Sequence, residues 1–369
     1  SSTVLNPGDR AVVRGKIYPF TARHGGYGRL MTRRGYVGTL YLNRSSLLLR
    51  DTLHRELSPK HLSLFLHERA VARLDRLALA PDEQALCNAM TAGDRRSLSP
   101  ALRAAYSRSG TSHLLAVSGL HVGIVFLLAN LLLWWLPLFR HGHILRNIAV
   151  ILLIWLYAAT TGFPPSVVRA ALMFSVLQFA LASSSEYVGM NTLAGVAFVM
   201  LLFHPDYLFD ISFQLSFIAV AGIIAWGLPL CRLLRTRRKS IDMLTATLAI
   251  GFSASAATAP LISHTFGQIS VVGLALNPVV ILLSYVVVGS CTLWLVIPGT
   301  VLAPLFSDVA GFAARAQNEL IRAAAALPAA ALDIRLTTTQ CWIVYGLFIF
   351  ATLLLWSAER KKSVSSLPE

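Results

Sequence analysis

Residues 113–136, HLLAVSGLHVGIVFLLANLLLWWL, contain no Asp, Glu, Lys or Arg. About 20 apolar residues are enough for a helix to cross the roughly 30 Å of hydrocarbon in a bilayer. Further apolar stretches lie at residues 144–161, 165–183, 190–204, 211–231, 243–263, 271–297 and 338–357. We therefore predict a mainly α, polytopic helical membrane protein with seven or eight spans.

The composition favours the same class. The 369 residues are 55% hydrophobic and 13% charged, whereas soluble domains carry about 25% charged residues. Residues 190–204 are short for a span, and residues 305–327 are amphipathic. Asn277-Pro278 inside 271–297 predicts that this stretch is broken or re-entrant.

Four regions follow one another along the chain. Short β-prone stretches separated by glycines predict part of a small β-barrel in residues 1–50. Apolar residues at helical spacing predict amphipathic helices in residues 51–110, at the bilayer surface. Residues 111–358 form the transmembrane region, and residues 359–369 form a basic tail.

Charge predicts the orientation. Residues 1–110 hold 18 Lys and Arg against 8 Asp and Glu, a net charge of +10. The short loops around Arg140 and around residues 232–239 are rich in arginine, so the positive-inside rule places both in the cytoplasm and residues 1–110 outside. The charge of the tail predicts a cytoplasmic end. An odd number of spans after residue 243 predicts the opposite, so the side of the tail stays open.

The segment His113–Gly123 is unusual for a membrane anchor because it combines two histidines, a serine and two glycines. Small residues allow helices to approach closely, and ionisable residues within a span are candidates for function. His113, Ser118 and His121 are therefore candidate residues of a polar path. The plain alternative for His113 is a position among the lipid headgroups.

The segment Thr161–Met173, TGFPPSVVRAALM, contains a cation about one turn inside a predicted span. Pro164 and Pro165 are suited to the first turn of that helix. A charge within the hydrocarbon costs several kcal/mol. Arg169 therefore either lines a polar path or extends its side chain to the interface.

Two later stretches place polar side chains in apolar spans. Asp210 and Gln214 lie in the first, and His264 and Asn277 belong to the second. Such groups need partners inside the membrane. We therefore add these four residues to the path candidates.

Together, these stretches resemble the competence domain of the ComEC family. The residues that carry the resemblance are HLLAVSGLHVG, TGFPPSVVRAALM, HPDYLFDISFQLSFIAVAG and TAPLISHTFGQISVVGLALNPV, in the order and spacing of the family. GGYGRLMTRRGYVGTLYL, residues 25–42, resembles the second half of that family's extracytoplasmic oligonucleotide-binding (OB) barrel. The DNA-binding candidates in this stretch are Arg29, Arg33, Arg34 and Tyr36.

The resemblance implies a channel of the bacterial inner membrane that takes up single-stranded DNA during natural transformation. It also implies a periplasmic DNA receptor and a cytoplasmic ATP-driven translocase as partners, and a homo-oligomer is compatible with the sequence. Ser1 in place of Met, and the absence of the family's first helices and first half-barrel, indicate a fragment.

The sequence does not indicate an enzyme. Gly15-Lys16 lacks the upstream glycine of a P-loop, and His141-Gly142-His143 lacks the following Asp-His of the family's metallo-β-lactamase-like domain. We expect no cofactor and no metal. A secondary transporter of a small solute is the main alternative, and an intramembrane hydrolase using Ser118 and His121 is a weaker one.

Overall fold

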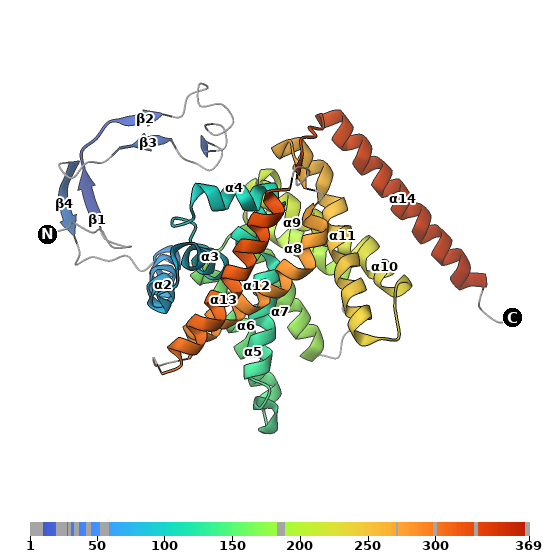
Figure 1. The fold of residues 1–369 in the computed structure, drawn as a ribbon, viewed down its shortest axis with the longest axis horizontal. Helices are drawn as coiled ribbons and strands as arrows, with labels where there is room; N and C mark the ends of the chain where they lie inside the picture. The colour runs from blue at the N-terminus through green and yellow to red at the C-terminus, as the bar shows by residue number, and fades with distance from the viewer. Residues whose placement is uncertain are drawn as a thin grey trace.

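The computed structural model describes residues 10–19, 28, 31–32, 37–41, 46–51, 59–182, 189–270, 272–297, 301–327 and 331–365. The α-helices in this part of the chain are α2 (Pro59–Leu74), α3 (Pro81–Thr91), α4 (Pro100–Arg108), α5 (Gly119–Leu132), α6 (Gly142–Thr160), α7 (Pro165–Ala182), α8 (Gly189–Phe203), α9 (Ile211–Gly222), α10 (Leu228–Leu233), α11 (Lys239–Phe266), α12 (Val272–Val296), α13 (Ala303–Ala325) and α14 (Thr338–Ser365). Short 3-10 turns are η3 (Asp75–Leu77), η4 (Ser112–Leu115), η5 (Leu136–Leu138) and η6 (Pro205–Phe209), and η7 (Ile223–Gly227) is a π-helical turn. Figure 1 shows most of the helices gathered in one body, with β1 to β4 on one side of it and α14 extending from the other.

The described part of residues 1–50 forms two separate antiparallel ladders. Strand β1 (Arg10–Val13) pairs with β4 (Leu47–Asp51), and β2 (Ile17–Pro19) pairs with β3 (Gly38–Leu40). Strands are therefore present where the sequence predicts them. The ladders do not close into a barrel within the described residues, so the OB-like character of this region remains a prediction.

Helices α2, α3 and α4 occupy the region in which amphipathic helices were predicted. In α2, Val71 and Leu74 are buried while Arg69 is exposed. Helix α3 differs, because most of its residues are buried all around the helix. Residues of α12 and α13 share a buried cluster with α3.

Each predicted span coincides with an apolar helix. Five helical segments in the described residues are long and apolar enough to cross a membrane: Gly119–Leu138, Gly142–Thr160, Ile211–Leu233, Ile241–Phe266 and Leu276–Val296. Three shorter apolar helices are Pro165–Ala180, Gly189–Phe203 and Thr338–Leu353. The protein is a polytopic helical membrane protein, as the sequence predicts.

The sequence predicts that residues 271–297 are broken or re-entrant, and the first of these alternatives is wrong, because the helix does not break at Asn277-Pro278. Helix α12 continues through Pro278 to Val296. Pro278 is the seventh residue of α12, where a proline removes one backbone hydrogen bond and crowds the carbonyl one turn earlier. Helices in a membrane tolerate such prolines because neighbouring groups satisfy the freed backbone. The π-helical turn lies elsewhere, at η7, directly before Pro229. A proline at this point also removes one backbone donor, and π turns occur where the regular ladder is interrupted.

The buried residues form three clusters. The largest joins α2, α3, α4, α12 and α13, with Ile124 of α5 at its edge. A second joins α5, α6 and α7, and a third joins α8 and α9 with side chains of α7. We call the end of the α5–α6–α7 group at which α5 begins, α6 ends and α7 begins, at Gly119, Thr160 and Pro165, the near end. The opposite end, at Leu132 and Gly142, is the far end.

Candidate functional site

The turn between α6 and α7 is built from TGFPP. Gly162 adopts a φ of +84°, its N–H donates to the Ala159 carbonyl and the Phe163 N–H donates to the Ala158 carbonyl. These are the two hydrogen bonds of a Schellman motif, which ends a helix and favours glycine at the left-handed position. Pro165 then begins α7 at once. The local sequence thereby fixes Arg169 in the second turn of α7.

The first two motifs lie against each other at the near end. Ser166 Oγ donates to the Val117 carbonyl at 3.0 Å. A Cβ on Gly119 would lie 2.8 Å from Arg169 Nη2, so the absence of a side chain at residue 119 makes room for the guanidinium. The first turn of α5 and the second turn of α7 thus form one contact.

The third motif reaches the same place. The Arg169 guanidinium carbon lies 5.8 Å from the ring centroid of Phe217 on α9, within cation–π range. Arg169 Nη1 also lies 3.5 Å from Met173 Sδ, and Arg169 is only 6% exposed. Three motifs far apart in the sequence therefore meet at one buried cation, among side chains of α5, α7 and α9.

His121 is fully buried in the first turn of α5. Its Nδ1 accepts a hydrogen bond of 3.1 Å from the backbone N–H of Ser118. Because Nδ1 is an acceptor, the ring proton lies on Nε2, and this buried N–H has no hydrogen-bond partner in the described structure. A buried donor of this kind costs about 1–3 kcal/mol. The Ser118 backbone N–H occupies His121 Nδ1, the ring nitrogen that carries the lone pair. A hydrolase would need this nitrogen to accept the proton of the Ser118 hydroxyl.

Asp210 and Gln214 stabilise the start of α9. Asp210 Oδ1 accepts from the backbone N–H groups of Ser212 and Phe213 at 2.8 and 3.3 Å, which makes it a helix N-cap. Gln214 Nε2 donates to the Leu208 carbonyl at 2.8 Å. Asp210 and Gln214 thus stabilise the turn that leads into α9.

His264 holds the end of α11 to the segment that precedes α14. His264 Nδ1 lies 3.0 Å from the Leu336 carbonyl oxygen, and Ser263 Oγ donates to the Ile334 carbonyl at 2.6 Å. His264 is therefore not grouped with Arg169 by any contact found in the described residues.

Asn277 and His113 occupy different surroundings. Asn277 Oδ1 is buried in α12 without a hydrogen-bond partner in the described structure. His113 is exposed in η4, ahead of the first apolar helix. Such a position agrees with the alternative of a headgroup location for His113.

The four DNA-binding candidates Arg29, Arg33, Arg34 and Tyr36 lie outside the described residues. Two other tyrosines of the strand region are described. Tyr18 and Tyr41 are 49% and 75% exposed, and their rings meet edge to face with centroids 5.8 Å apart. Lys16 Nζ lies 5.8 Å from the Tyr18 centroid. In the described structure these two rings are therefore available to solvent and are not core.

A polar cluster toward the far end is not predicted by the sequence. Arg146 Nη2 donates to Asn130 Oδ1 at 2.9 Å, linking α5 to α6. Gln178 Nε2 donates to Asn147 Oδ1 at 2.6 Å, linking α6 to α7. In the sequence, the amides of this cluster stand singly within apolar stretches, and their spacing does not show which residues they contact.

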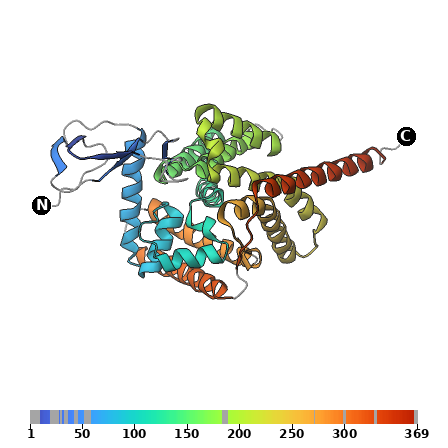
Figure 2. The same ribbon diagram turned by 90° about the horizontal axis from the view of Figure 1, so that it is seen from above.

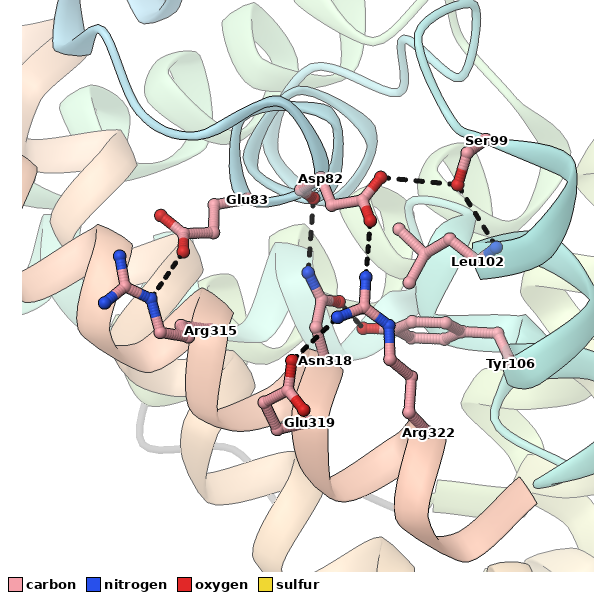
Figure 3. Close-up of polar contacts among 9 residues, drawn as sticks. All are labelled: Asp82, Glu83, Ser99, Leu102, Tyr106, Arg315, Asn318, Glu319 and Arg322. Carbon is pink, nitrogen blue, oxygen red and sulfur yellow. Dashed lines mark hydrogen bonds and ion pairs between the residues drawn. The ribbon is translucent and has the colours of Figure 1, made fainter. Parts of the chain in front are cut away.

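A second polar cluster ties α13 to α3 and α4 (Figure 3). Arg315 Nε pairs with Glu83 Oε1 at 2.7 Å, and Arg322 pairs with Asp82. Tyr106 donates to Asn318 Oδ1 at 3.1 Å beneath them. The charged residues line a hollow of about 370 Å³. Among the described residues no three His, Cys, Asp or Glu side chains are grouped so that they could hold a metal ion.

The fold and the buried polar contacts define the class as a polytopic helical membrane protein whose near end is organised around an arginine. Comparison with known proteins gives the family. The model of the family described as Competence protein matches residues 90–361, and the chain belongs to this family.

Two relatives illustrate the match. ComE operon protein 3 of Bacillus subtilis (strain 168) is 32% identical over 204 residues, which are 54% of this chain and 24% of that protein. An uncharacterized protein of Aquifex aeolicus (strain VF5) is 29% identical over 201 residues, 54% of this chain and 45% of that protein. The match thus covers less than half of either relative. No solved structure matches the chain.

Proposed function

We propose that the chain forms a passage for single-stranded DNA across the bacterial inner membrane in natural transformation. Membership of the Competence protein family supports a role in DNA uptake. The observation that carries the finer proposal is the buried Arg169, enclosed by Gly119 of α5 and Phe217 of α9. A strand with one negative charge per nucleotide cannot enter hydrocarbon without compensating cations and water.

The near end faces outward in this proposal. The arginine-rich loop around residues 232–239 lies in the cytoplasm by the positive-inside rule. Counting spans back from it places the start of α5 outside the cytoplasm, together with residues 1–110. A strand arriving from outside then meets the exposed aromatic rings and cations of the strand region before it reaches Arg169. Neutralising phosphates with Lys and Arg releases counterions, so this first binding step depends on salt.

The chain acts as a conduit and not as an enzyme in this proposal. The energy for inward movement comes from an ATP-driven translocase on the cytoplasmic side, and a periplasmic receptor delivers the DNA. Within the passage, Arg169 offers a planar fork of donors suited to phosphate oxygens. His121 contributes a buried N–H in the first turn of α5.

The test is the transformation frequency of Arg169 variants produced at equal levels in the membrane. Arg169→Ala should reduce transformation by at least ten-fold, and Arg169→Lys should restore it only in part because lysine lacks the fork. Arg140→Ala, at an exposed arginine beyond the far end, is the matched control. Wild-type transformation in the Arg169→Ala strain would remove the role of this residue. An Arg169 variant that lost uptake of a small solute but kept wild-type transformation would favour a secondary transporter.

A further inference from the structure

Helices α12 and α13 form an antiparallel hairpin whose two ends return to one place. Strand β5 (Ile269–Ser270), directly before α12, pairs with β6 (Ala331–Leu332), which follows α13. In the register of this ladder, Ser270 faces Ala331. The chain therefore leaves the hairpin on the side of the membrane on which it entered, and the hairpin makes no net crossing.

The start of α12 lies at the near end. A Cβ on Gly273 would lie 2.8 Å from the Ser109 carbonyl oxygen, just ahead of η4 and α5. Further along, α12 shares a buried cluster with Ile124, and Leu120 and Leu128 pack against the same cluster. The helix thus passes the first half of α5.

The other end of α12 is attached to α2. Arg73 donates to the backbone carbonyls of Trp294 and Ile297, where α12 ends. Trp294 Nε1 donates back to the Arg73 carbonyl at 2.9 Å, and the guanidinium carbon lies 5.1 Å from the Trp294 ring centroid. These reciprocal contacts hold the last turn of α12 against the last turn of α2.

Helix α2 is attached in turn to the end of α6 at the near end. Ser63 Oγ donates to the Ala159 carbonyl at 2.6 Å, and His67 Nδ1 lies 3.1 Å from the Thr160 carbonyl oxygen. Ser63 and His67 are four residues apart in α2, but the residues that they contact, Ala159 and Thr160, are neighbours in α6. Two helices with parallel axes would advance by equal steps between two such contacts. We infer that the axis of α2 crosses that of α6, so α2 extends sideways from it.

These contacts attach the start of α12 to Ser109, ahead of η4, and its end to α2. From His67 to Arg73 the helix α2 advances about 9 Å, mainly sideways, whereas α6 extends about 28 Å to the far end at 1.5 Å per residue. Arg73 holds the last turn of α12 close to the end of α2. The end of α12 therefore lies beside the end of α2, and we infer that it does not reach the level of Gly142. Figure 1 shows α12 and α13 running obliquely across the group, with the end of α5 extending below them.

The outward face of α13 changes character along its length. Leu305, Val309 and Phe312 are exposed apolar residues, and the same stripe continues with the charged residues Arg315, Glu319 and Arg322. The Arg315 side chain is 68% exposed beside its partner Glu83 (Figure 3). An apolar half suits lipid, and an exposed charged half requires water or headgroups. The change marks a boundary between lipid and water across α13.

We propose that α12 and α13 form a re-entrant hairpin that dips into the bilayer from the near end without crossing it. Seven described segments then cross: α5, α6, α7, α8, α9 to α10, α11 and α14. Helix α14 starts beside the end of α11 and runs back along it, with Tyr345 OH donating to the Ala257 carbonyl at 3.2 Å. Its end therefore lies on the side of the basic 232–239 loop. The hairpin is independent of what the passage carries.

The experiment is site-directed labelling with a membrane-impermeant maleimide, in intact cells and in inverted vesicles. Single cysteines are introduced by Ser112→Cys at the near end, Arg237→Cys in the basic loop, Val301→Cys at the turn of the hairpin and Ser363→Cys in α14. The native Cys231 is half-buried, so all four native cysteines are first replaced by serine. Labelling after denaturation shows that each thiol is present.

We expect Ser363→Cys to label from the same side as Arg237→Cys, and Val301→Cys not to label from that side. Labelling of Val301→Cys together with Arg237→Cys would show that α12 crosses the bilayer and would overturn the hairpin. Labelling of Ser363→Cys together with Ser112→Cys would show a net crossing in the hairpin and would overturn it as well. If Arg237→Cys and Ser363→Cys labelled from outside and Ser112→Cys from the cytoplasm, with Val301→Cys still not labelled from the Arg237 side, the orientation under Proposed function would fail and the hairpin would stand.

Discussion

The guanidinium of Arg169 fills the space that a side chain at Gly119 would occupy, since a Cβ there would lie 2.8 Å from Arg169 Nη2. This one contact joins two motifs separated by fifty residues. It explains why the start of α5 needs a glycine at this position, quite apart from the flexibility of glycine. The contact also allows the position of Arg169 to be tested without changing Arg169.

Gly119→Ala should therefore displace the Arg169 guanidinium and reduce transformation by at least ten-fold. Alanine is otherwise favoured over glycine within a helix by roughly 1 kcal/mol, so helix formation itself should not suffer. Gly251→Ala in α11 is the matched control, because a Cβ at Gly251 meets nothing within 4 Å. Equal transformation by the two variants, at equal amounts of membrane protein, would show that the packing of Arg169 does not matter for uptake.

His121 offers a test that separates stability from uptake. His121→Asn keeps an acceptor near the position of Nδ1, so the hydrogen bond from the Ser118 N–H can persist, but it removes the Nε2 donor. We expect a thermal unfolding temperature in detergent close to wild type, together with reduced transformation. His121→Leu should lose the hydrogen bond as well and unfold at a lower temperature than His121→Asn, because the Ser118 N–H is then left without its partner. Full transformation by His121→Asn would assign His121 a purely structural role.

Tyr106 tests the cluster that joins α4 to α13. Its hydroxyl is buried, donates to Asn318 Oδ1 and accepts from Gln317 Nε2 at 3.3 Å. Burial raises the pKa of this hydroxyl well above its usual value, so it stays protonated at neutral pH. Tyr106→Phe should destabilise the protein by about 1–3 kcal/mol because two buried groups lose their partner.

The measurement for this prediction is thermal unfolding in detergent. The matched control is Tyr285→Phe, at a tyrosine that is 38% exposed on α12. Destabilisation of the control by the same amount would mean that the Tyr106 hydrogen bonds contribute nothing specific.

The exposed pair Tyr18 and Tyr41 predicts a stacking contribution to DNA binding. Tyr18→Ala and Tyr41→Ala should each weaken binding of a labelled single-stranded oligonucleotide, since stacking of one base on an aromatic ring is worth about 1–3 kcal/mol. The corresponding phenylalanine variants keep the ring and should bind nearly as wild type. Binding measured over a range of salt should fall as salt rises. Affinity that is unchanged by salt would contradict the electrostatic part of the proposal.

Local chemistry alone accounts for much of what the sequence predicts correctly. The apolar stretches require helices in a bilayer because only internal hydrogen bonding satisfies the backbone there. The TGFPP segment likewise encodes the end of α6 and the start of α7 through one left-handed glycine and a proline. The arginine within an apolar stretch points to a special site because an isolated charge is costly in hydrocarbon.

Tertiary structure decided what each polar group meets. Asp210 is predicted from the sequence to line a polar path, but it caps α9. Phe217 is an ordinary apolar residue in the sequence, but its ring lies beside the Arg169 guanidinium. Hydropathy makes Leu276–Val296 a candidate span, and Asn277-Pro278 adds from the sequence only the alternatives of a broken or re-entrant stretch. Hydropathy records transfer into lipid and does not show where the ends of a helix are attached. Contacts with Arg73 and Ser109, both distant in sequence, fix where the two ends of α12 lie. No local pattern encodes such contacts, because they exist only once separate helices have packed.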